Sequence, residues 1–270
     1  NNFMPTAKDI KPHIAEAKII ALCSPLNPTG TTFSEKGLEE ICDLILEENK
    51  KRGEQKKPVY LLFDQIYWQL THGLTIHVDP VSLRPRMKNY TIYVDGISKA
   101  FAATGVRVGW AFGPQKVINK MRSICSHLGA WSPKAEQIAC ANYLMNDHAV
   151  DNYLVDIKSK INQRLNAFHE GFNNLKSLGY RVSAIAPQAA MYLTVKISIQ
   201  CSTTPDGNKL TTAEAVTKYL LNDAKIALVP FYAFGASKKS SWYRLSVGTV
   251  KIEDIPGFFG NLRASLDRLT

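Results

Sequence analysis

The first half of the sequence alternates short apolar runs with stretches of helical periodicity, and this order restricts the fold more than any other feature. Apolar runs of strand length occupy residues 19–23, 59–63, 91–94 and 106–111. Between the first two runs, the helical spacing of Leu38, Ile41 and Ile45 behind Ser34 predicts a helix with that serine as its N-cap. Runs that are apolar on both faces and alternate with helices are typical of a largely parallel sheet covered by helices on both sides.

After residue 114 the pattern becomes mainly helical, and it ends in a mixture of short strands and helices. Helices are predicted at about 115–127, at a segment capped by Ser132 with Pro133 in its first position, and at 149–177. Short strands and helices follow at 190–197, 213–223, 227–229, 242–247 and 252–268. We therefore predict an α/β fold with a large domain, whose mainly parallel sheet is flanked by helices, and a smaller α+β C-terminal domain. We assign residues 1–150 to the large domain, and residues 151–270 to an interdomain helix followed by the small domain.

Composition narrows the class of protein without choosing a function. The 270 residues are 45% hydrophobic and contain no apolar run of about eighteen residues, so we expect a soluble chain without a membrane span. The 33 Lys+Arg against 23 Asp+Glu give a net charge of +10, which is compatible with nucleic acid, an acidic surface or anionic small molecules. The charged segment 50–57 is predicted to be an exposed loop.

The cysteines and the N-terminus give expectations about location and completeness. Five cysteines are an odd number, and none forms a C-x-x-C pair, so we expect a reducing, cytoplasmic compartment. The first residues show no targeting pattern and no initiator methionine. We therefore expect the chain to begin inside a longer polypeptide.

Four polar residues stand at or near the ends of the apolar runs, where α/β sheets bind their ligands. They are Asn27, Asp64, Lys99 and Arg107. Two have ordinary structural alternatives, because Asn27 belongs to an Asn-Pro turn and Asp64, like Asp95, is able to cap a helix.

Arg107 and Lys99 are harder to explain as structural residues. Arg107 stands inside the apolar run 106–111, and a guanidinium on a buried strand requires an anionic partner. Lys99 stands among small and apolar neighbours, a setting that favours a nucleophilic amine. An amine and an anion receptor on one connection, at positions 99 and 107, predict a ligand that carries both a carbonyl group and a phosphate.

These segments resemble fold-type I enzymes that depend on pyridoxal 5'-phosphate, specifically the class I and II aminotransferase family of aspartate and aromatic aminotransferases. Five motifs follow in the family's order: Asn-Pro-Thr-Gly at 27–30, Asp64 with Tyr67, Ser98 with Lys99, Arg107, and Tyr-Arg-Leu-Ser at 243–246. The resemblance covers essentially the whole chain. It implies transfer of an amino group between an amino acid and a 2-oxo acid, in a homodimer, with no nucleic acid or membrane as partner.

The resemblance also implies a role for each residue that matches a motif. Lys99 would form the internal aldimine with the cofactor and later move a proton as general acid and base. Asp64 would pair with the pyridine nitrogen, and Asn27 and Tyr67 would donate to the phenolate oxygen of the ring.

The anionic groups would fall to the remaining matched residues. Ser98 and Arg107 would hold the cofactor phosphate, and Arg244, with Asn27, would bind the substrate carboxylate through its planar guanidinium. No metal ligand is expected, because the six histidines are scattered along the chain.

The sequence departs from the family's pattern at three places. Gly96 stands where the family often has a serine that binds phosphate, and Phe231 replaces the glycine of a Pro-Gly-x-x-Phe-Gly turn at 230–235. The family's N-terminal arm, first strand, glycine-containing phosphate loop and ring-stacking aromatic residue do not precede the Asn-Pro turn. We therefore expect the chain to be the C-terminal portion of a longer enzyme.

Other functions remain as alternatives. The segment 96–100 nearly matches the G-x-S-x-G element of serine hydrolases, but Ala100 replaces the last glycine and no convincing Asp and His follow. The same family motifs serve C–S lyases and decarboxylating enzymes, and similar domains act as ligand sensors in transcription regulators. The side chain of the substrate is not predicted by the sequence.

Overall fold

The computed structural model describes residues 2–270 and divides into two compact units. One unit comprises the chain up to Leu26 together with Thr31–Ile157, and the other comprises Asn27–Gly30 together with Lys158–Thr270. A helix, α6 (Asp147–Ser177), runs through the boundary between the units. The short segment Asn27–Gly30 therefore belongs to the second unit although it lies early in the sequence.

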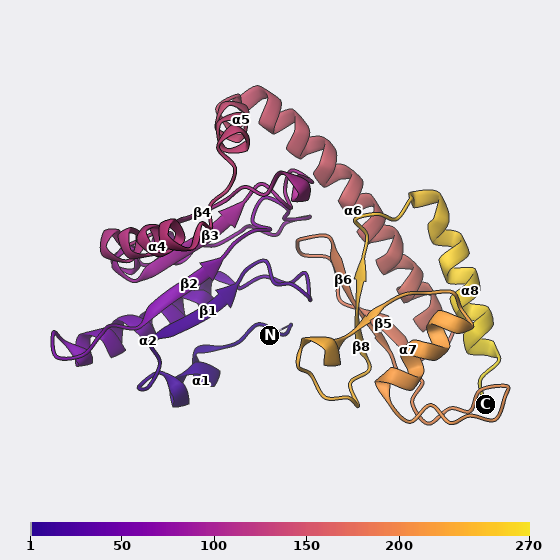
Figure 1. The fold of residues 1–270 in the computed structure, drawn as a ribbon. Coiled ribbons are helices and arrows are strands. Elements are labelled where there is room, and N and C mark those ends of the chain that lie inside the picture. The colour runs from indigo at the N-terminus through magenta and orange to yellow at the C-terminus, as the bar shows by residue number, and fades with distance from the viewer. Residues whose placement is uncertain (1) are drawn as a thin grey trace. The chain divides into compact units, whose positions relative to one another are not determined.

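The first unit contains a four-stranded sheet in the order β1-β2-β3-β4 (Figure 1). Its strands are β1 (Ile19–Cys23), β2 (Tyr60–Asp64), β3 (Thr91–Gly96) and β4 (Gly109–Phe112). The first three strands are parallel, and β4 is antiparallel to β3. As expected for a strand covered on both faces, β3 is buried along most of its length, whereas β4 is largely exposed.

The helices of the first unit are α1 (Ala7–Ile10), α2 (Glu35–Arg52), α3 (Pro80–Leu83), α4 (Gln115–Leu128) and α5 (Lys134–Leu144). The expected cap of α2 is present, since the Ser34 hydroxyl accepts a hydrogen bond from the N–H of Gly37 at 3.1 Å. Leu38, Ile41 and Ile45 are fully buried and pack with β2 into the core. Burial of this apolar stripe orients α2 on the sheet.

Two sequence predictions about these helices were wrong. The segment 50–57 is not wholly a loop, because α2 continues to Arg52, which is buried. Its guanidinium donates hydrogen bonds to Glu48 and to the carbonyl oxygens of Ile14, Ala15 and Lys57. These bonds hold the C-terminal end of α2 to the segment before β1 and to the loop after the helix. The helix that was predicted to have Ser132 as its N-cap begins instead at Lys134. Its N-cap is Pro133, and no side chain caps it.

The second unit contains an antiparallel sheet in the order β5-β6-β8-β7. Its strands are β5 (Val182–Ala184), β6 (Tyr192–Ile197), β7 (Val229–Pro230) and β8 (Trp242–Ser246), and its helices besides α6 are α7 (Ala213–Asn222) and α8 (Ile255–Asp267). Buried Phe168 and Phe172 of α6 form edge contacts with Phe258 of α8. These aromatic contacts join the helices of the unit.

The segment Asn27–Gly30 is held against β6 by hydrogen bonds to backbone oxygens. The hydroxyl of Thr194 donates to the carbonyl oxygen of Thr29 at 2.8 Å, and the N–H of Ala189 donates to that of Gly30 at 2.9 Å. Gly30 has φ +69°, and a Cβ there would lie 2.4 Å from the carbonyl oxygen of Tyr192. Only glycine fits this close approach of two backbones.

We expect Gly30→Ala to lower the free energy of unfolding by about 2–4 kcal/mol, because it adds left-handed strain to a backbone clash. Gly207→Ala is the matched control, since Gly207 also has a positive φ, +80°, but no atom lies within 4 Å of its added Cβ. The control should cost only about 1–2 kcal/mol. Urea denaturation compares the two, and equal losses would contradict the clash.

Candidate active site

Asp64 and Lys99 lie at the carboxyl ends of neighbouring strands. Asp64 is the last residue of β2, and Lys99 follows the end of β3 by three residues. Because β2 and β3 are parallel, both ends lie at the same edge of the sheet. This edge is where ligands bind in open α/β sheets, and it brings a carboxylate and an amine to one side of the first unit.

Neither functional group is fully engaged by the protein. Asp64 is half-buried, and its Oδ1 accepts a hydrogen bond from the N–H of Ile66 at 3.1 Å. Lys99 is half-buried beside Ile97 and Ala100, which are 5% and 3% exposed. Within residues 2–270 the Lys99 amine forms no hydrogen bond or ion pair. A cation in a partly apolar setting without an anionic partner is available to a ligand.

The structure explains why glycine, not serine, occupies position 96. Gly96 pairs with Gly109 between β3 and β4. A Cβ on Gly96 would lie 2.9 Å from the carbonyl oxygen of Val108 and 3.0 Å from the Cα of Gly109. A serine therefore does not fit unless β4 moves, and any contact of residue 96 with a phosphate must come from its backbone.

Ser98 and Arg107 belong to one connection, residues 97–108, which is held together by Thr104. The hydroxyl of Thr104 donates to the carbonyl oxygen of Ser98 at 3.2 Å, and its own carbonyl oxygen accepts from Nη1 of Arg107 at 2.9 Å. The two predicted phosphate ligands thus lie on a single hydrogen-bonded loop. This loop also carries Lys99.

The placement of Arg107 differs from the sequence prediction. Arg107 is exposed, has φ +61°, and lies between the 3-10 turn Thr104–Val106 and the start of β4 at Gly109. It is therefore not part of a buried strand, and the need for a buried anionic partner disappears. Its position on a loop still allows the guanidinium to reach a solvent-borne anion.

The buried Asp95 stabilises the connection that follows β2 and carries Tyr67. Tyr67 is 2% exposed and lies in a turn beside Trp68. The carboxylate of Asp95 accepts hydrogen bonds from Nε1 of Trp68 at 2.8 Å and from the N–H of Gly96 at 2.7 Å. Burial raises the pKa of Asp95 above its ordinary value, although these hydrogen bonds oppose the rise. Asp95 therefore ties the turn that carries Tyr67 to the end of β3.

Sequence reasoning did not single out Asp95 and Trp68 as partners. An aspartate at a strand end has the ordinary function of a cap, and its partner lies 27 residues away in the chain. The only signal in the sequence was the position of Trp68 directly after the Asp-x-x-Tyr element, and this position does not indicate which residue its indole contacts.

In the second unit, Arg244 and Asn27 contact each other directly. Nη1 of Arg244 donates a hydrogen bond to Oδ1 of Asn27 at 2.9 Å, although 217 positions separate them. The Cζ atom of Arg244 lies 4.7 Å from the ring centroid of Tyr192 and 5.1 Å from that of Phe234. The Nε atom is buried and has no hydrogen-bond partner within residues 2–270. The guanidinium thus keeps an unused donor, which suits a carboxylate.

The predicted residues therefore form two groups, one in each unit. The second unit holds Arg244 and Asn27. The first unit holds the other predicted residues, which are Asp64, Tyr67, Ser98, Lys99 and Arg107.

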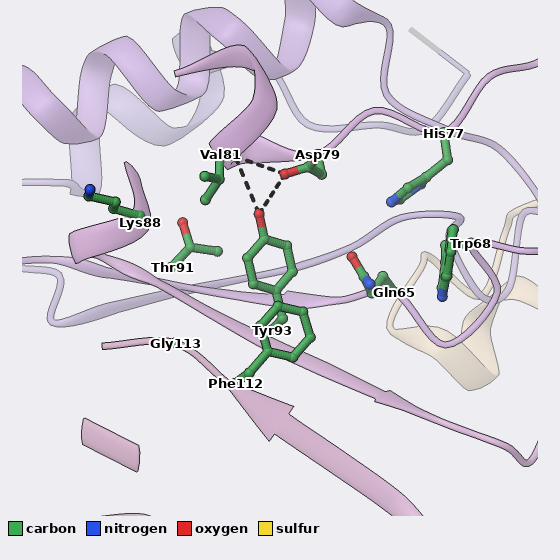
Figure 2. Close-up of a pocket in the computed structure, with 10 residues that line it drawn as sticks. All are labelled: Gln65, Trp68, His77, Asp79, Val81, Lys88, Thr91, Tyr93, Phe112 and Gly113. Atoms are coloured by element: carbon green, nitrogen blue, oxygen red, sulfur yellow. Dashed lines mark hydrogen bonds between the residues drawn. The ribbon is translucent and has the colours of Figure 1, made fainter. Parts of the chain in front are cut away.

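The first unit also contains a cavity of about 630 Å³ whose lining includes none of the predicted residues. Figure 2 shows its lining, in which Tyr93 and Phe112 stack with their ring centroids 4.7 Å apart. The ten residues are Gln65, Trp68, His77, Asp79, Val81, Lys88, Thr91, Tyr93, Phe112 and Gly113. Its walls are built by the connection that leads from β2 to β3, by Thr91 and Tyr93 in the first half of β3, and by the end of β4.

Asp79 organises one wall of this cavity. Its Oδ1 accepts hydrogen bonds from the hydroxyl of Tyr93 at 2.7 Å and from the N–H groups of Val81 and Ser82 at the start of α3 (Figure 2). Burial acts to raise the pKa of Asp79, but the hydrogen bonds outweigh it and the pKa lies below its ordinary value of 3.8.

We expect Asp79→Ala to lower the free energy of unfolding by about 1–3 kcal/mol at pH 7, because α3 loses its N-cap and Tyr93 its partner. A depressed carboxyl pKa stabilises the fold above the unfolded-state pKa, and this contribution is lost as the pH falls through the folded-state pKa. Urea denaturation should therefore show a smaller difference in acid below the ordinary value of 3.8. Tyr93→Phe, which removes the two hydrogen bonds of the Tyr93 hydroxyl but keeps the N-cap of α3, is the control. A difference that persists undiminished in acid would contradict the assignment.

Comparison with known proteins gives a consistent result. The model of the family described as "Aminotransferase class I and II" matches residues 1–258. An aspartate aminotransferase of Rhizobium meliloti (strain 1021) is 28% identical over 272 residues, covering 100% of this chain and 62% of the relative. One from Bacillus subtilis (strain 168) is 27% identical, covering 92% and 58%. The chain thus spans about three-fifths of the length of the curated relatives it matches.

Solved structures agree with the sequence comparison. A crystal structure of the Rhizobium meliloti aspartate aminotransferase superimposes with a TM-score of 0.86 and 26% identity, over 99% of this chain and 63% of that one. The Thermus thermophilus enzyme with maleate gives a TM-score of 0.76 and 28% identity, over 99% and 60%. Both the predicted fold class and the predicted family are confirmed, and the chain belongs to the aminotransferase class I and II family.

Proposed function

We propose that this chain supplies the lysine-bearing part of a pyridoxal-phosphate-dependent aminotransferase, which transfers an amino group between an amino acid and a 2-oxo acid. The observation that carries the proposal is that Lys99 and Asp64 lie at the same edge of the parallel strands, and that the amine forms no hydrogen bond or ion pair within residues 2–270. An amine that attacks a carbonyl needs this freedom, because an ion pair would keep it protonated.

The chemistry of the nearby groups fits the cofactor. Lys99 offers an amine for its aldehyde, Asp64 a carboxylate for its protonated ring nitrogen, and the loop with Ser98 and Arg107 a hydroxyl and a guanidinium for its phosphate. Tyr67 lies in the turn directly after Asp64 and offers a phenol. When bound, the cofactor's ring accepts the electron pair that remains after the substrate Cα loses a proton.

The residues of the chain then divide the remaining work. Nζ of Lys99 takes the proton from the substrate Cα and returns it, as a general base and acid. The carboxylate of Asp64 would keep the ring nitrogen of the cofactor protonated. The guanidinium of Arg244, with Asn27 bound to one of its nitrogens, binds the carboxylate that amino acids and 2-oxo acids share.

Aspartate is the first substrate to test. Relatives from Rhizobium meliloti and Bacillus subtilis are named aspartate aminotransferases, and one from Petunia hybrida is named a bifunctional aspartate and glutamate/aspartate-prephenate aminotransferase. The proposal also includes a homodimer, as the resemblance implies, and the cytoplasm. All five cysteines are free, which agrees with a reducing compartment. No helix among residues 2–270 is long and apolar enough to cross a membrane.

The test is to supply the protein with pyridoxal 5'-phosphate, aspartate and 2-oxoglutarate, and to measure oxaloacetate and glutamate together. Equal amounts of the two products support transamination. Release of ammonia or carbon dioxide in place of glutamate would favour a lyase or a decarboxylase, and cofactor binding without turnover of any amino acid would favour a ligand sensor. A protein that binds no cofactor would contradict the proposal as a whole.

A further inference from the structure

The guanidinium of Arg244 lies close to two aromatic rings. Tyr192 in β6 and Phe234 in the 3-10 helix η4 (Phe231–Phe234) both lie within about 5 Å of its Cζ atom, at 4.7 and 5.1 Å. A cation at this distance from a ring is attracted to the electrons of its face. Two rings from different elements therefore act on one side chain.

Phe234 is unusually exposed for a large apolar residue. Its side chain is 42% exposed, and a large apolar surface left in water gains nothing for the fold. Its ring is nevertheless held, since it meets the ring of Phe231 edge to face with centroids 6.3 Å apart. Phe231 is 5% exposed and thus anchored in the unit.

Phe231 is also the residue that departs from the family's Pro-Gly-x-x-Phe-Gly turn. A glycine at 231 has no side chain and so leaves the ring of Phe234 without this support. The replacement therefore builds a chain of contacts in this protein, from the buried Phe231 through Phe234 to Arg244. Gly235, with φ +89°, ends the 3-10 helix directly after Phe234 and turns the backbone away.

The aromatic contacts do not occupy the hydrogen-bond donors of the Arg244 guanidinium. Nη1 is engaged by Asn27, and the buried Nε is without a partner within residues 2–270. Rings packed over a guanidinium leave its hydrogen-bond donors, which lie in its plane, free to bind. A carboxylate binds an arginine in this plane, with two parallel hydrogen bonds.

We propose that Phe231, Phe234 and Tyr192 form an aromatic support that positions the guanidinium of Arg244 for a substrate carboxylate. The proposal rests on the proposed function, because it takes the carboxylate of an amino acid or 2-oxo acid as the ligand of Arg244. The three aromatic residues do not touch the reacting atoms. They are positioning residues, and they fix the arginine before the carboxylate arrives.

The experiment compares Phe234→Leu with Phe234→Tyr. Both variants keep a large side chain at a position that is 42% exposed, where the hydroxyl of tyrosine is able to reach water, so neither is expected to unfold the protein. Only tyrosine keeps a ring over the arginine. The affinity for maleate, a dicarboxylate, is measured by calorimetry on the cofactor-loaded protein. The Nε–H resonance of Arg244 is recorded by NMR without cofactor, because a ring close to this group shifts its proton to a lower frequency.

We expect Phe234→Leu to raise the Kd for maleate about three- to tenfold and to move the Arg244 Nε–H resonance towards its position in a free arginine. Phe234→Tyr should retain both properties. Phe231→Leu should give a smaller change in the same direction, since it removes only the support of Phe234. The cofactor affinity should stay constant in all three.

Three results would overturn the inference, and they are distinguishable. Unchanged maleate affinity in Phe234→Leu, with normal binding by the parent protein, would show that the ring does not position Arg244, and the proposed function would stand. If the parent protein binds cofactor but no dicarboxylate, the carboxylate role of Arg244 is wrong and the inference falls with it. If it binds neither, the proposed function itself fails.

Discussion

Lys99→Ala is expected to abolish covalent attachment of pyridoxal 5'-phosphate and to reduce amino-group transfer by about 10²- to 10⁴-fold. The physical reason is that the proposed function gives Lys99 two tasks, in which its amine would hold the cofactor and would also move a proton at the substrate Cα. The absorbance band of the protein-bound cofactor and the rate of glutamate formation from 2-oxoglutarate measure the two tasks separately.

The control for this variant is Lys116→Ala, at an exposed lysine on α4 in the same unit. It should leave the absorbance band and the rate unchanged. A small primary amine added to Lys99→Ala should restore part of the proton transfer, because it replaces the missing base in solution. A Lys99→Ala protein that retains both the band and the rate would contradict the assignment of this lysine.

The second large effect is expected at Asp64. Asp64→Asn should reduce amino-group transfer about ten- to hundredfold, because a charged hydrogen bond is replaced by a neutral one. Asparagine keeps an oxygen for the N–H of Ile66, which Oδ1 of Asp64 binds at 3.1 Å, so the turn after β2 should remain intact. The variant therefore separates the charge of Asp64 from its structural hydrogen bond.

Three measurements make this prediction specific. The melting temperature of Asp64→Asn should stay near that of the parent, its cofactor should remain attached at Lys99, and its rate should fall. Asp64→Ala, which also loses the bond to Ile66, should be less stable than Asp64→Asn by about 1 kcal/mol. An Asp64→Asn variant with the parent's rate would show that the carboxylate charge takes no part in the reaction.

The strands and most helices of this fold were predictable because their patterns are local. The apolar stripe of α2 appears in the sequence as helical spacing, and the same residues are buried in the structure. The parallel arrangement of β1, β2 and β3 followed from strands apolar on both faces. The antiparallel direction of β4 was not predicted, since no residue pattern within a single strand determines the direction of its neighbour.

Arg107 shows where a local pattern was misleading. The apolar residues on both sides of Arg107 indicated a strand that includes it. In the structure β4 begins at Gly109, two residues after Arg107, where Gly109 pairs closely with Gly96. The backbone before that point turns through a positive φ at Arg107. The contact that decides the conformation thus comes from another strand, and it is invisible in the sequence around the arginine.

The sequence identified the candidate site residues by their positions after strands and by the order of family motifs, but not their partners. The hydrogen bond between Arg244 and Asn27 and the contact of Asp95 with Trp68 each join distant parts of the chain. Such pairs depend on tertiary packing, because one sequence contains no information on which side chains meet. The aromatic rings around Arg244 were missed for the same reason.

The central claim is that Lys99 is the residue that holds the cofactor, and borohydride reduction tests it most directly. Reduction fixes the cofactor to the amine that holds it, and proteolysis with mass spectrometry then identifies the labelled peptide. We predict that the label appears on Lys99 alone and that Lys99→Ala yields no labelled peptide. A label on any other lysine, or no label on a protein saturated with cofactor, would contradict the account.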